Sequence, residues 1–325
     1  MRRTFPLLLT AAALLAAGLT ACGDSDAPAG KGGSSGGGGT RSVTVGAIAI
    51  VDTAPVYLAQ SQGFFKKHGI DAKITSVQGG AASITGVMGG QFAFGFANTT
   101  SLLTAQQQGL PLKVVANGVA STGERDTDYS AVLVPAGSPV KSAKDLAGRT
   151  VAVNQLKNIG DTTVRAAVRK DGGDASKVEF VEMPFPDMPA ALSKGRVDAI
   201  WEVEPFVTQA TGQGARAVAW PYADAAPDLT VAMYFTTQQT LQKDPELVKD
   251  FTTAMNEALA YADAHPDAVR ETLKSYTSIP AEAIAAIKLP KWPTEINRDS
   301  VQTVADDARQ DGTLTKDADL AALLP

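Results

Sequence analysis

Short apolar runs with strand character alternate with helix-like segments along most of the chain, and this alternation is what most constrains the fold. The expected strands of a first set are residues 43–50, 72–77, 92–96 and 112–119, and the helices between them are residues 55–68, 81–88 and 99–108. A strand that pairs in parallel with the next needs a crossover connection, usually a helix. The first set therefore predicts an α/β lobe with a mainly parallel sheet.

A second set of the same kind follows. Its expected strands are residues 150–154, 178–182, 197–202 and 216–220, with helices at residues 161–170 and 189–194. Two further apolar strands, residues 129–135 and 229–236, have no helix of their own and are predicted to pair as crossings that form a hinge. This order predicts one lobe from residues 43–130 plus 235–325 and a second, inserted lobe from residues 136–228. Ligands of such sheets bind beyond the carboxyl ends of the strands, so two facing lobes predict a cleft.

The amino-terminal segment has the features of an export signal. Arg2 and Arg3 precede an apolar run over residues 5–19, which ends in Leu-Thr-Ala-Cys. The run is shorter than the ~20 residues of a membrane-spanning helix, so residues 1–21 are interpreted as a cleaved signal peptide. Cys22 is the only cysteine, which excludes an intrachain disulfide. Its context resembles the bacterial lipobox, which predicts lipidation of Cys22 and a location on the outer face of the cell membrane.

Residues 22–42 follow as a lipidated cysteine and a Gly/Ser-rich stretch with almost nothing apolar to bury, typical of a flexible tether. The net charge of −5 argues against a nucleic-acid partner. With one cysteine and two histidines, the chain has no Cys/His spacing suited to a metal, and neither a metal nor a cofactor is expected.

Three segments resemble one family of binding proteins. They are Gly-Phe-Phe-Lys-Lys-His-Gly-Ile-Asp-Ala at residues 63–72, Lys-Asp-Leu-Ala-Gly-Arg-Thr-Val-Ala-Val at 144–153, and Ala-Leu-Ser-Lys-Gly-Arg-Val-Asp-Ala-Ile at 191–200. The chain is similar here to the nitrate-, sulfonate-, taurine- and thiamine-precursor-binding proteins of ABC importers. The resemblance implies a type II periplasmic-binding-protein fold, a monomer that closes on a small solute, and an ABC permease with a cytoplasmic ATPase as partner.

Polar residues at expected strand ends of the first lobe are candidate ligand contacts. Asp52 and Thr53 follow the first strand and face either the cleft or the first helix, which they would cap, and Tyr57 lies one turn inside that helix. Gln78 and Gly79 end the second strand, where a plain turn is the alternative. Asn98 and Thr99 end the third strand and open a helix, which favours ligand contact.

In the second lobe, Asn158 and Ile159 lie in a loop that leads to a helix amino terminus, a common anion-binding position. The nearby Asp161 argues against a strongly anionic ligand there, although it also suits helix capping. Phe185 is a candidate apolar wall, with core packing as the alternative. Glu202 and Glu204 are expected to hold an amino or amidine group through one of the two carboxylates, or else to support a helix start.

These features predict a non-enzymatic solute-binding lipoprotein whose ligand is a small anion or an amine-bearing heteroaromatic molecule such as a thiamine precursor. An enzyme of the same fold, similar to thiamine-pyrimidine synthase, is the main alternative. Neither His68 nor His265 lies in an expected cleft loop, and no nucleophile elbow or phosphate-binding loop is present, which argues against it. A ligand sensor that signals to a membrane receptor is the third interpretation.

Overall fold

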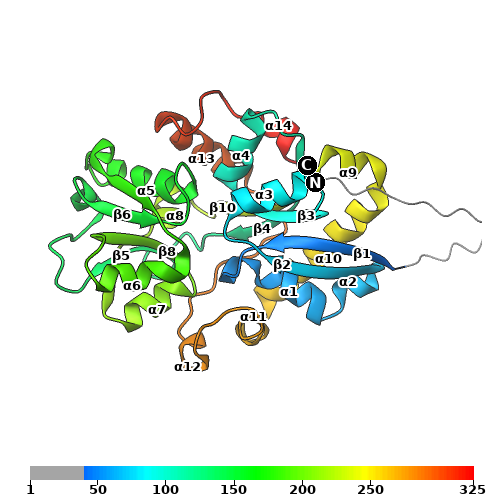
Figure 1. Cartoon of the computed structure of the whole chain (residues 1–325), viewed down its shortest axis with the longest axis horizontal. Helices are drawn as coiled ribbons and strands as arrows, with labels where there is room; N and C mark the ends of the chain where they lie inside the picture. Colours follow the sequence, from blue (N-terminus) through cyan, green and yellow to red (C-terminus); the bar gives the residue numbers. More distant parts are fainter. Residues whose placement is uncertain (1–39) are drawn as a thin grey trace, which may run out of the picture. The chain divides into compact units, whose positions relative to one another are not determined.

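The alternation of strands and helices builds two separate five-stranded sheets in the part of the chain that the structure describes (Figure 1). The computed structural model describes residues 40–325, so the expected signal peptide, Cys22 and the tether up to residue 39 lie outside the described residues. No helix among residues 40–325 is long and apolar enough to cross a membrane. The folded body begins with a strand at Arg41, two residues before the expected start at Val43.

The first sheet has the order β2-β1-β3-β10-β4. Its strands are β1 (Arg41–Ala47), β2 (Ile70–Ser76), β3 (Phe94–Asn98), β4 (Leu112–Ala120) and β10 (Thr230–Thr237). β1 pairs in parallel with β2 and β3, with Val43 opposite Ala72 and Val45 opposite Phe94. β10 runs antiparallel to both of its neighbours. We call this sheet with its covering helices the first lobe.

The second sheet has the order β7-β6-β8-β5-β9. Its strands are β5 (Ser130–Pro135), β6 (Thr150–Val153), β7 (Glu179–Glu182), β8 (Ala199–Val203) and β9 (Ala215–Ala219). β6 pairs in parallel with β7 and β8, and β5 runs antiparallel to β8 and β9. This sheet and its helices form the second lobe, so the expected α/β class with two lobes is confirmed.

Helices connect the strands, and the helices expected at residues 81–88, 99–108, 161–170 and 189–194 are present, whereas α7 and α8 of the second lobe were not expected. In the first lobe they are α1 (Ala54–Ser61), α2 (Phe64–Lys67), α3 (Gly80–Met88) and α4 (Thr99–Gln107). In the second lobe they are α5 (Ile159–Lys170), α6 (Met188–Ser193), α7 (Phe206–Gly212) and α8 (Pro221–Ala225). Short 3-10 turns precede two of these helices, η1 (Val51–Thr53) before α1 and η4 (Phe185–Asp187) before α6. Two others precede strands, η2 (Ala143–Leu146) before β6 and η3 (Ala175–Lys177) before β7.

The single helix expected over residues 55–68 is two helices, α1 and α2. Gly63 separates them with a φ of 80°, a left-handed conformation that glycine adopts without steric cost. The periodicity of the apolar residues continues across this break, which is why the sequence pattern alone does not reveal it.

The two strands expected to pair as crossings do not pair with each other. β5 lies inside the second sheet and β10 inside the first. The chain passes between the lobes in the segments just before these strands, residues 121–129 and 220–229, which we call the crossing segments. A backbone hydrogen bond from Ser121 N to Leu229 O, 2.9 Å long, joins them, as does an ion pair between Arg125 and Asp224.

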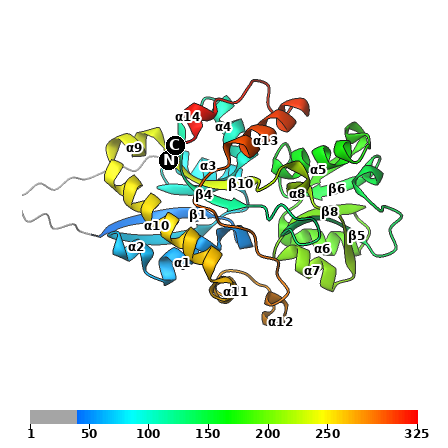
Figure 2. The ribbon, with the colours of Figure 1, turned by 180° about the vertical axis from the view of Figure 1, so that it is seen from behind.

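The carboxyl-terminal third returns to the first lobe and also touches the second. It contains α9 (Gln238–Lys243), α10 (Pro245–Ala264), α11 (Pro266–Leu273), α12 (Ala281–Ile284), α13 (Arg298–Gln310) and α14 (Leu320–Leu323). α10 packs on α1, α2 and β4 (Figure 2). Its Phe251 ring stacks on Phe94 of β3 at 3.7 Å. α13 contacts α4 of the first lobe and α5 of the second, where Arg169 binds Asp307 and Asp311.

Candidate functional site

The carboxyl ends of the parallel strands of both sheets meet around a small cavity between the lobes, which we call the central cavity. Its volume is about 20 Å³, which is room for about one water molecule. Its polar lining residues are Asp52, Asn98 and Asn154, and its aromatic lining residues are Phe96, Phe185, Trp201 and Tyr222. This is the position that the strand-end rule predicts for a ligand.

Asp52 contributes a buried carboxylate with spare hydrogen-bonding capacity. The residue is 3% exposed, and its Oδ2 accepts a hydrogen bond from the Tyr129 hydroxyl at 3.3 Å. Its Oδ1 has no hydrogen-bond partner among the described residues. Burial raises the pKa of Asp52 to about 7. A buried acceptor without a partner is costly, so this oxygen is suited to a donor that arrives with a ligand.

The expected capping role of Asp52 and Thr53 is not seen, since neither side chain bonds to a free N–H at the start of α1. Thr53 instead donates its hydroxyl to Ile48 O at 2.6 Å and Ile50 O at 3.1 Å. It therefore fixes the loop after β1 and does not line the central cavity. Tyr57 also lies outside this cavity, with its ring stacked on Tyr276 at 3.7 Å.

Asn98 and Asn158 bind each other across the two lobes. The Asn98 amide donates to Asn158 Oδ1 at 2.6 Å, and the Asn158 amide donates to Ser101 Oγ at 2.7 Å. Asn98 also caps α4 by accepting from Ser101 N at 2.9 Å. We call these three side chains the asparagine clasp. It joins the amino ends of α4 and α5. Asn98 and Asn158, which were predicted to contact a ligand, are therefore hydrogen-bonded to each other in this structure.

Other predicted polar residues near the clasp have local roles. Thr99 donates its hydroxyl to Thr230 O at 2.8 Å and so links α4 to β10. Asp161 caps α5, with Oδ1 accepting from Asn158 N at 2.6 Å and Oδ2 accepting from Lys157 N at 2.8 Å. Gln78 is exposed. At Gly79, an added Cβ would lie 3.2 Å from Gln155 Oε1 of the second lobe, so glycine permits close approach of the lobes there.

Aromatic side chains of the second lobe form one wall of the central cavity. Trp201 is 1% exposed, packs beside Phe185 with 5.7 Å between ring centroids, and has an indole N–H without a partner among the described residues. An added Cβ at Gly160 would lie 2.6 Å from the Trp201 ring, so glycine is needed there. Ile159 also lines the cavity, as does Phe185. Both were predicted as contacts, whereas Trp201 and Tyr222 were not.

The two glutamates differ from each other, and neither lines the central cavity. Glu204 Oε2 accepts from Thr208 N at 3.0 Å, and Oε1 accepts from Thr208 Oγ1 at 2.8 Å and Lys288 N at 3.2 Å. Burial raises the pKa of Glu204 to about 7. Its carboxylate thus supports the start of α7 and ties it to the carboxyl-terminal segment.

Glu202 is fully buried, and neither carboxylate oxygen has a partner among the described residues. It lies opposite Ala131 of β5, whereas Trp201 lies opposite Val132, so the two side chains project from opposite faces of the sheet. Because Trp201 faces the cavity, Glu202 faces away from it. Burial, with the nearby Glu204 charge, raises the pKa of Glu202 well above its usual value.

Charge and metal chemistry narrow what the central cavity can bind. No lysine or arginine is among its lining residues in the part of the chain described. Residues 40–325 hold no group of three or more His, Cys, Asp or Glu side chains placed to bind a metal. His68 contacts Glu257 at 3.1 Å, and His265 stacks on Tyr261 at 4.0 Å, both away from the cavity.

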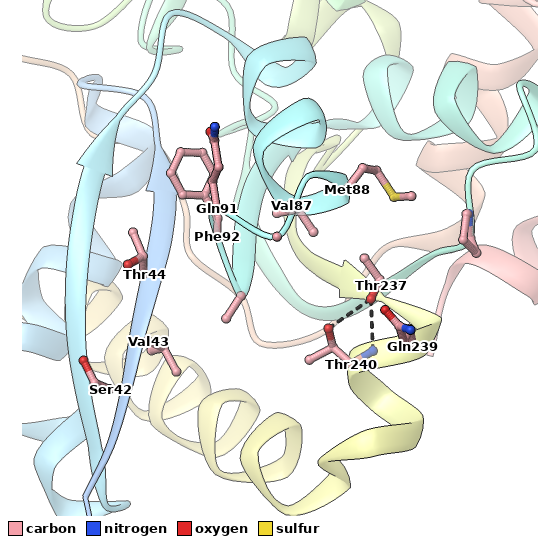
Figure 3. Close-up of a pocket in the computed structure, with 13 residues that line it drawn as sticks. Ser42, Val43, Thr44, Val87, Met88, Gln91, Phe92, Thr237, Gln239 and Thr240 are labelled. Atoms are coloured by element: carbon pink, nitrogen blue, oxygen red, sulfur yellow. Dashed lines mark hydrogen bonds between the residues drawn. The ribbon is translucent and has the colours of Figure 1, made fainter. Parts of the chain in front are cut away.

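A larger hollow of about 670 Å³ lies at the other end of the parallel strands of the first sheet, their amino ends (Figure 3). The start of β1 and the end of β10 line it, together with Met88 of α3 and Phe92. Its Thr237 hydroxyl already accepts from Thr240 N at 3.0 Å and so caps α9. This hollow faces the amino end of β1, away from the convergence of strand ends where ligands of α/β sheets bind.

Comparison with solved structures supports the two-lobed architecture. The alkanesulfonate-binding protein SsuA from Xanthomonas axonopodis pv. citri bound to MOPS aligns with a TM-score of 0.74 and 18% identity, over 87% of this chain and 98% of that chain. The periplasmic nitrate-binding protein NrtA from Synechocystis aligns with a TM-score of 0.74 and 15% identity, over 88% and 86%. At these identities the likeness shows the fold, and the expected periplasmic-binding-protein fold is confirmed.

Sequence comparison places the chain in a family. The riboflavin-binding protein RibY of Chloroflexus aurantiacus is 27% identical over 231 residues, which are 68% of this chain and 61% of the relative. The chain thus matches about three fifths of that protein's length. The model of the NMT1/THI5-like family matches residues 50–269. The chain therefore belongs to the NMT1/THI5-like family.

Proposed function

We propose that the protein is the extracytoplasmic solute-binding lipoprotein of an ABC importer. It captures a small organic solute between its lobes and delivers it to a permease with a cytoplasmic ATPase. The family membership, the fold shared with SsuA and NrtA, and the lining of the central cavity support this role. The relatives named above are binding proteins, which supports a binding role over a catalytic one.

The single observation that carries the choice of ligand is the unpartnered Oδ1 of Asp52 in the central cavity. A solute with N–H donors satisfies this oxygen, and when Asp52 is ionised a cationic donor gains a charge-assisted hydrogen bond. Nitrate or an alkanesulfonate without an amine would bring a negative charge beside this carboxylate, with no lysine or arginine in the described lining to offset it. An amine-bearing heteroaromatic solute is therefore favoured over an anion.

The remaining lining suits the same kind of molecule. Phe185, Trp201 and Tyr222 offer flat apolar surfaces for a ring. The Trp201 indole N–H and Asn154 Oδ1, both without partners among the described residues, offer one donor and one acceptor. A heteroaromatic ring that carries both an amine and a ring nitrogen matches these groups.

Capture requires that the solute contact both lobes only when they are closed, because a ligand shifts a conformational equilibrium by its difference in affinity for the two states. Asp52 belongs to the first lobe and Trp201 to the second, so a solute that touches both favours a closed state. In that state the lobes stand further apart than here, because the present cavity of about 20 Å³ holds only about one water molecule. The crossing segments, joined by Arg125 and Asp224, are the proposed hinge. Solute then enters and leaves by rotation of the lobes about these segments.

A thermal-shift and calorimetry screen of the purified protein tests this proposal. We expect 2,4-diaminopyrimidine or 4-amino-5-hydroxymethyl-2-methylpyrimidine to raise the melting temperature, because a ligand at 100 times its Kd stabilises the folded state by about 2.7 kcal/mol. Nitrate and a short alkanesulfonate, which are anions without an N–H donor, serve as the contrasting set. Stabilisation by the anions alone overturns the ligand class, and the absence of any shift with either set overturns the binding function.

Lipid attachment at Cys22 has a separate test. Cells given an alkyne analogue of palmitate are expected to label the native protein but not a Cys22→Ala variant, and the variant is expected to leave the membrane fraction. Equal labelling of the two proteins would exclude Cys22 as the lipidated residue.

A further inference from the structure

The helix α5 of the second lobe is joined to the first lobe at both of its ends. At its amino end, Asn158 takes part in the asparagine clasp. At its carboxyl end, roughly 16 Å further along the helix, the Arg169 guanidinium binds the carboxylates of Asp307 and Asp311 on α13. We call Arg169, Asp307 and Asp311 the interlobe ion triad. Among the ion pairs of residues 40–325, these are the ones that join a helix of one lobe to a helix of the other.

The acidic side of the triad is a fixed part of the first lobe. Ala308 of α13 lies in the same apolar cluster as Leu102 of α4. The amino end of α13 is bound to a crossing segment, because the Asn297 amide donates to the carbonyl oxygens of Pro227 and Asp228, both at 3.3 Å. The two aspartates of the triad lie roughly 15–20 Å further along α13. A rotation of the second lobe about the crossing segments can therefore separate α5 from these aspartates.

The triad is partly buried but still open to salt. The side chains of Arg169, Asp307 and Asp311 are 24%, 21% and 10% exposed, and Arg169 Nη2 donates to Asp307 Oδ1 at 2.9 Å. Burial raises the pKa of Asp311, and the positive charges of Arg169 and of Arg165, one turn earlier on α5, oppose this rise. Hydrogen bonds between charged groups are stronger than neutral ones, and salt weakens those that solvent reaches. The attraction between α5 and α13 therefore depends on ionic strength.

We propose that the interlobe ion triad holds the lobes together when no solute is bound, so that ionic strength controls how readily the protein opens. The Arg169 side chain is long and flexible, so it can keep its partners while the lobes part by the small distance that a solute needs. The triad thus favours the present arrangement and the solute-bound state over the open state. This inference rests on the proposed function, because it assigns a regulation to the opening and closing described there.

Small-angle scattering of the purified, unliganded protein at about 20 mM and about 1 M NaCl tests the proposal. The native protein is expected to be more open at the higher salt concentration. Arg169→Gln is expected to lower the ratio of closed to open protein about fivefold at the lower concentration and to respond little to added salt. Arg149→Gln is the matched control, because Arg149 pairs with Asp198 inside the second lobe at 3.8 Å, and it is expected to behave as the native protein.

A charge swap separates an interlobe attraction from a local effect of Arg169 on folding. Arg169→Asp combined with Asp311→Arg places the positive charge on α13 and an acidic partner on α5. The double variant is expected to recover the closed form at low salt and the response to added salt, whereas Arg169→Asp alone is expected to be open under both conditions. Urea unfolding of each variant measures stability separately from opening.

The outcomes separate this inference from the proposed function. If Arg169→Gln scatters as the native protein does at low salt, or keeps the native response to salt, the triad does not hold the lobes together, whatever its effect on stability. If Arg169→Gln does not fold, Asp307→Asn is measured in its place by the same criteria. Scattering of the unliganded protein needs no solute, so solutes that bind a protein with no salt response overturn the triad alone. Failure of every solute in the thermal-shift screen counts against the proposed function.

Discussion

Each lobe buries a carboxylate just after a strand that ends at the lobe interface, Asp52 after β1 and Glu204 after β8. Burial raises the pKa of each to about 7. Their hydrogen bonds differ, since Glu204 accepts from Thr208 and Lys288 with both oxygens, whereas Asp52 accepts only from Tyr129 with one of its two. A pKa shift alone thus does not separate a binding group from a structural one. An unused acceptor alone does not do so either, because Glu202 has two and faces away from the central cavity, whereas the unused acceptor of Asp52 belongs to a residue that lines it.

Asp52→Asn is the strongest test of this contrast. The affinity for 2,4-diaminopyrimidine is expected to fall roughly 100-fold, because loss of one partner from a buried charged hydrogen bond is costly. The unliganded protein is expected to keep its stability, since the Asp52 carboxylate has few internal partners. Calorimetry and urea unfolding measure the two effects. Asp71→Asn, which removes an exposed charge from β2 of the same lobe, is the control, and an equal loss of affinity there would contradict a specific role for Asp52.

Glu204→Gln is expected to show the opposite pattern. An amide N–H₂ group would replace one acceptor and oppose a donor from Thr208 or Lys288, so the free energy of unfolding is expected to fall by about 1–2 kcal/mol. Affinity for the diaminopyrimidine is expected to stay within about twofold, since Glu204 does not line the central cavity. Urea unfolding of the unliganded protein measures the first effect. A large loss of affinity with unchanged stability would mean that Glu204 contacts the ligand and does not mainly support the start of α7.

The asparagine clasp is expected to have a smaller effect on affinity, because it joins the lobes to each other and is not itself bound to the solute. Asn158→Ala removes two interlobe hydrogen bonds and is expected to lower the closed population of the unliganded protein. Solute affinity is then expected to fall about five- to tenfold, in line with about 1 kcal/mol of lost closure energy. Small-angle scattering is expected to show a more open unliganded form. Unchanged scattering and affinity would mean that the clasp does not hold the lobes closed.

The pH dependence of stability is expected to be the smallest effect. Asp52 and Glu204 hold protons up to about pH 7 in the folded protein but release them near their ordinary values of 3.8 and 4.5 when unfolded. Between pH 4 and 7 the folded state therefore binds more protons, so stability falls as the pH rises through this window. The unliganded protein should melt at least about 2 °C higher at pH 5.5 than at pH 8. Asp52→Asn should reduce this difference, and a higher melting temperature at pH 8 would contradict it.

Much of the fold was predictable because strands and helices alternate with clear periodicity, and the bounds of strands such as β4 and β6 differ from expectation by one residue. The crossing strands were not predictable in the same way. A continuous apolar run indicates burial on both faces, but it does not indicate which sheet supplies the neighbours. That choice depends on tertiary pairing, which placed β5 between β8 and β9 and β10 between β3 and β4.

At the candidate site, the strand-end rule located Asp52, Asn98, Ile159 and Phe185, which all line the central cavity. It could not show that Asn98 and Asn158 bond to each other, because that contact joins segments 60 residues apart. The period of two along β8 carried a usable signal, since it places Trp201 and Glu202 on opposite faces and only one of them can face a ligand. No local sequence pattern of this kind indicated that Tyr129 and Tyr222 lie near the central cavity.

The direction of β1 has a practical consequence for handling this protein. Its carboxyl end leads to the loop that carries Asp52, so its first residue, Arg41, lies about a strand length, roughly 20 Å, from the central cavity. An affinity handle, a sensor chip or a bead joined ahead of Arg41 should leave the central cavity unobstructed, which makes this end the natural choice for immobilisation.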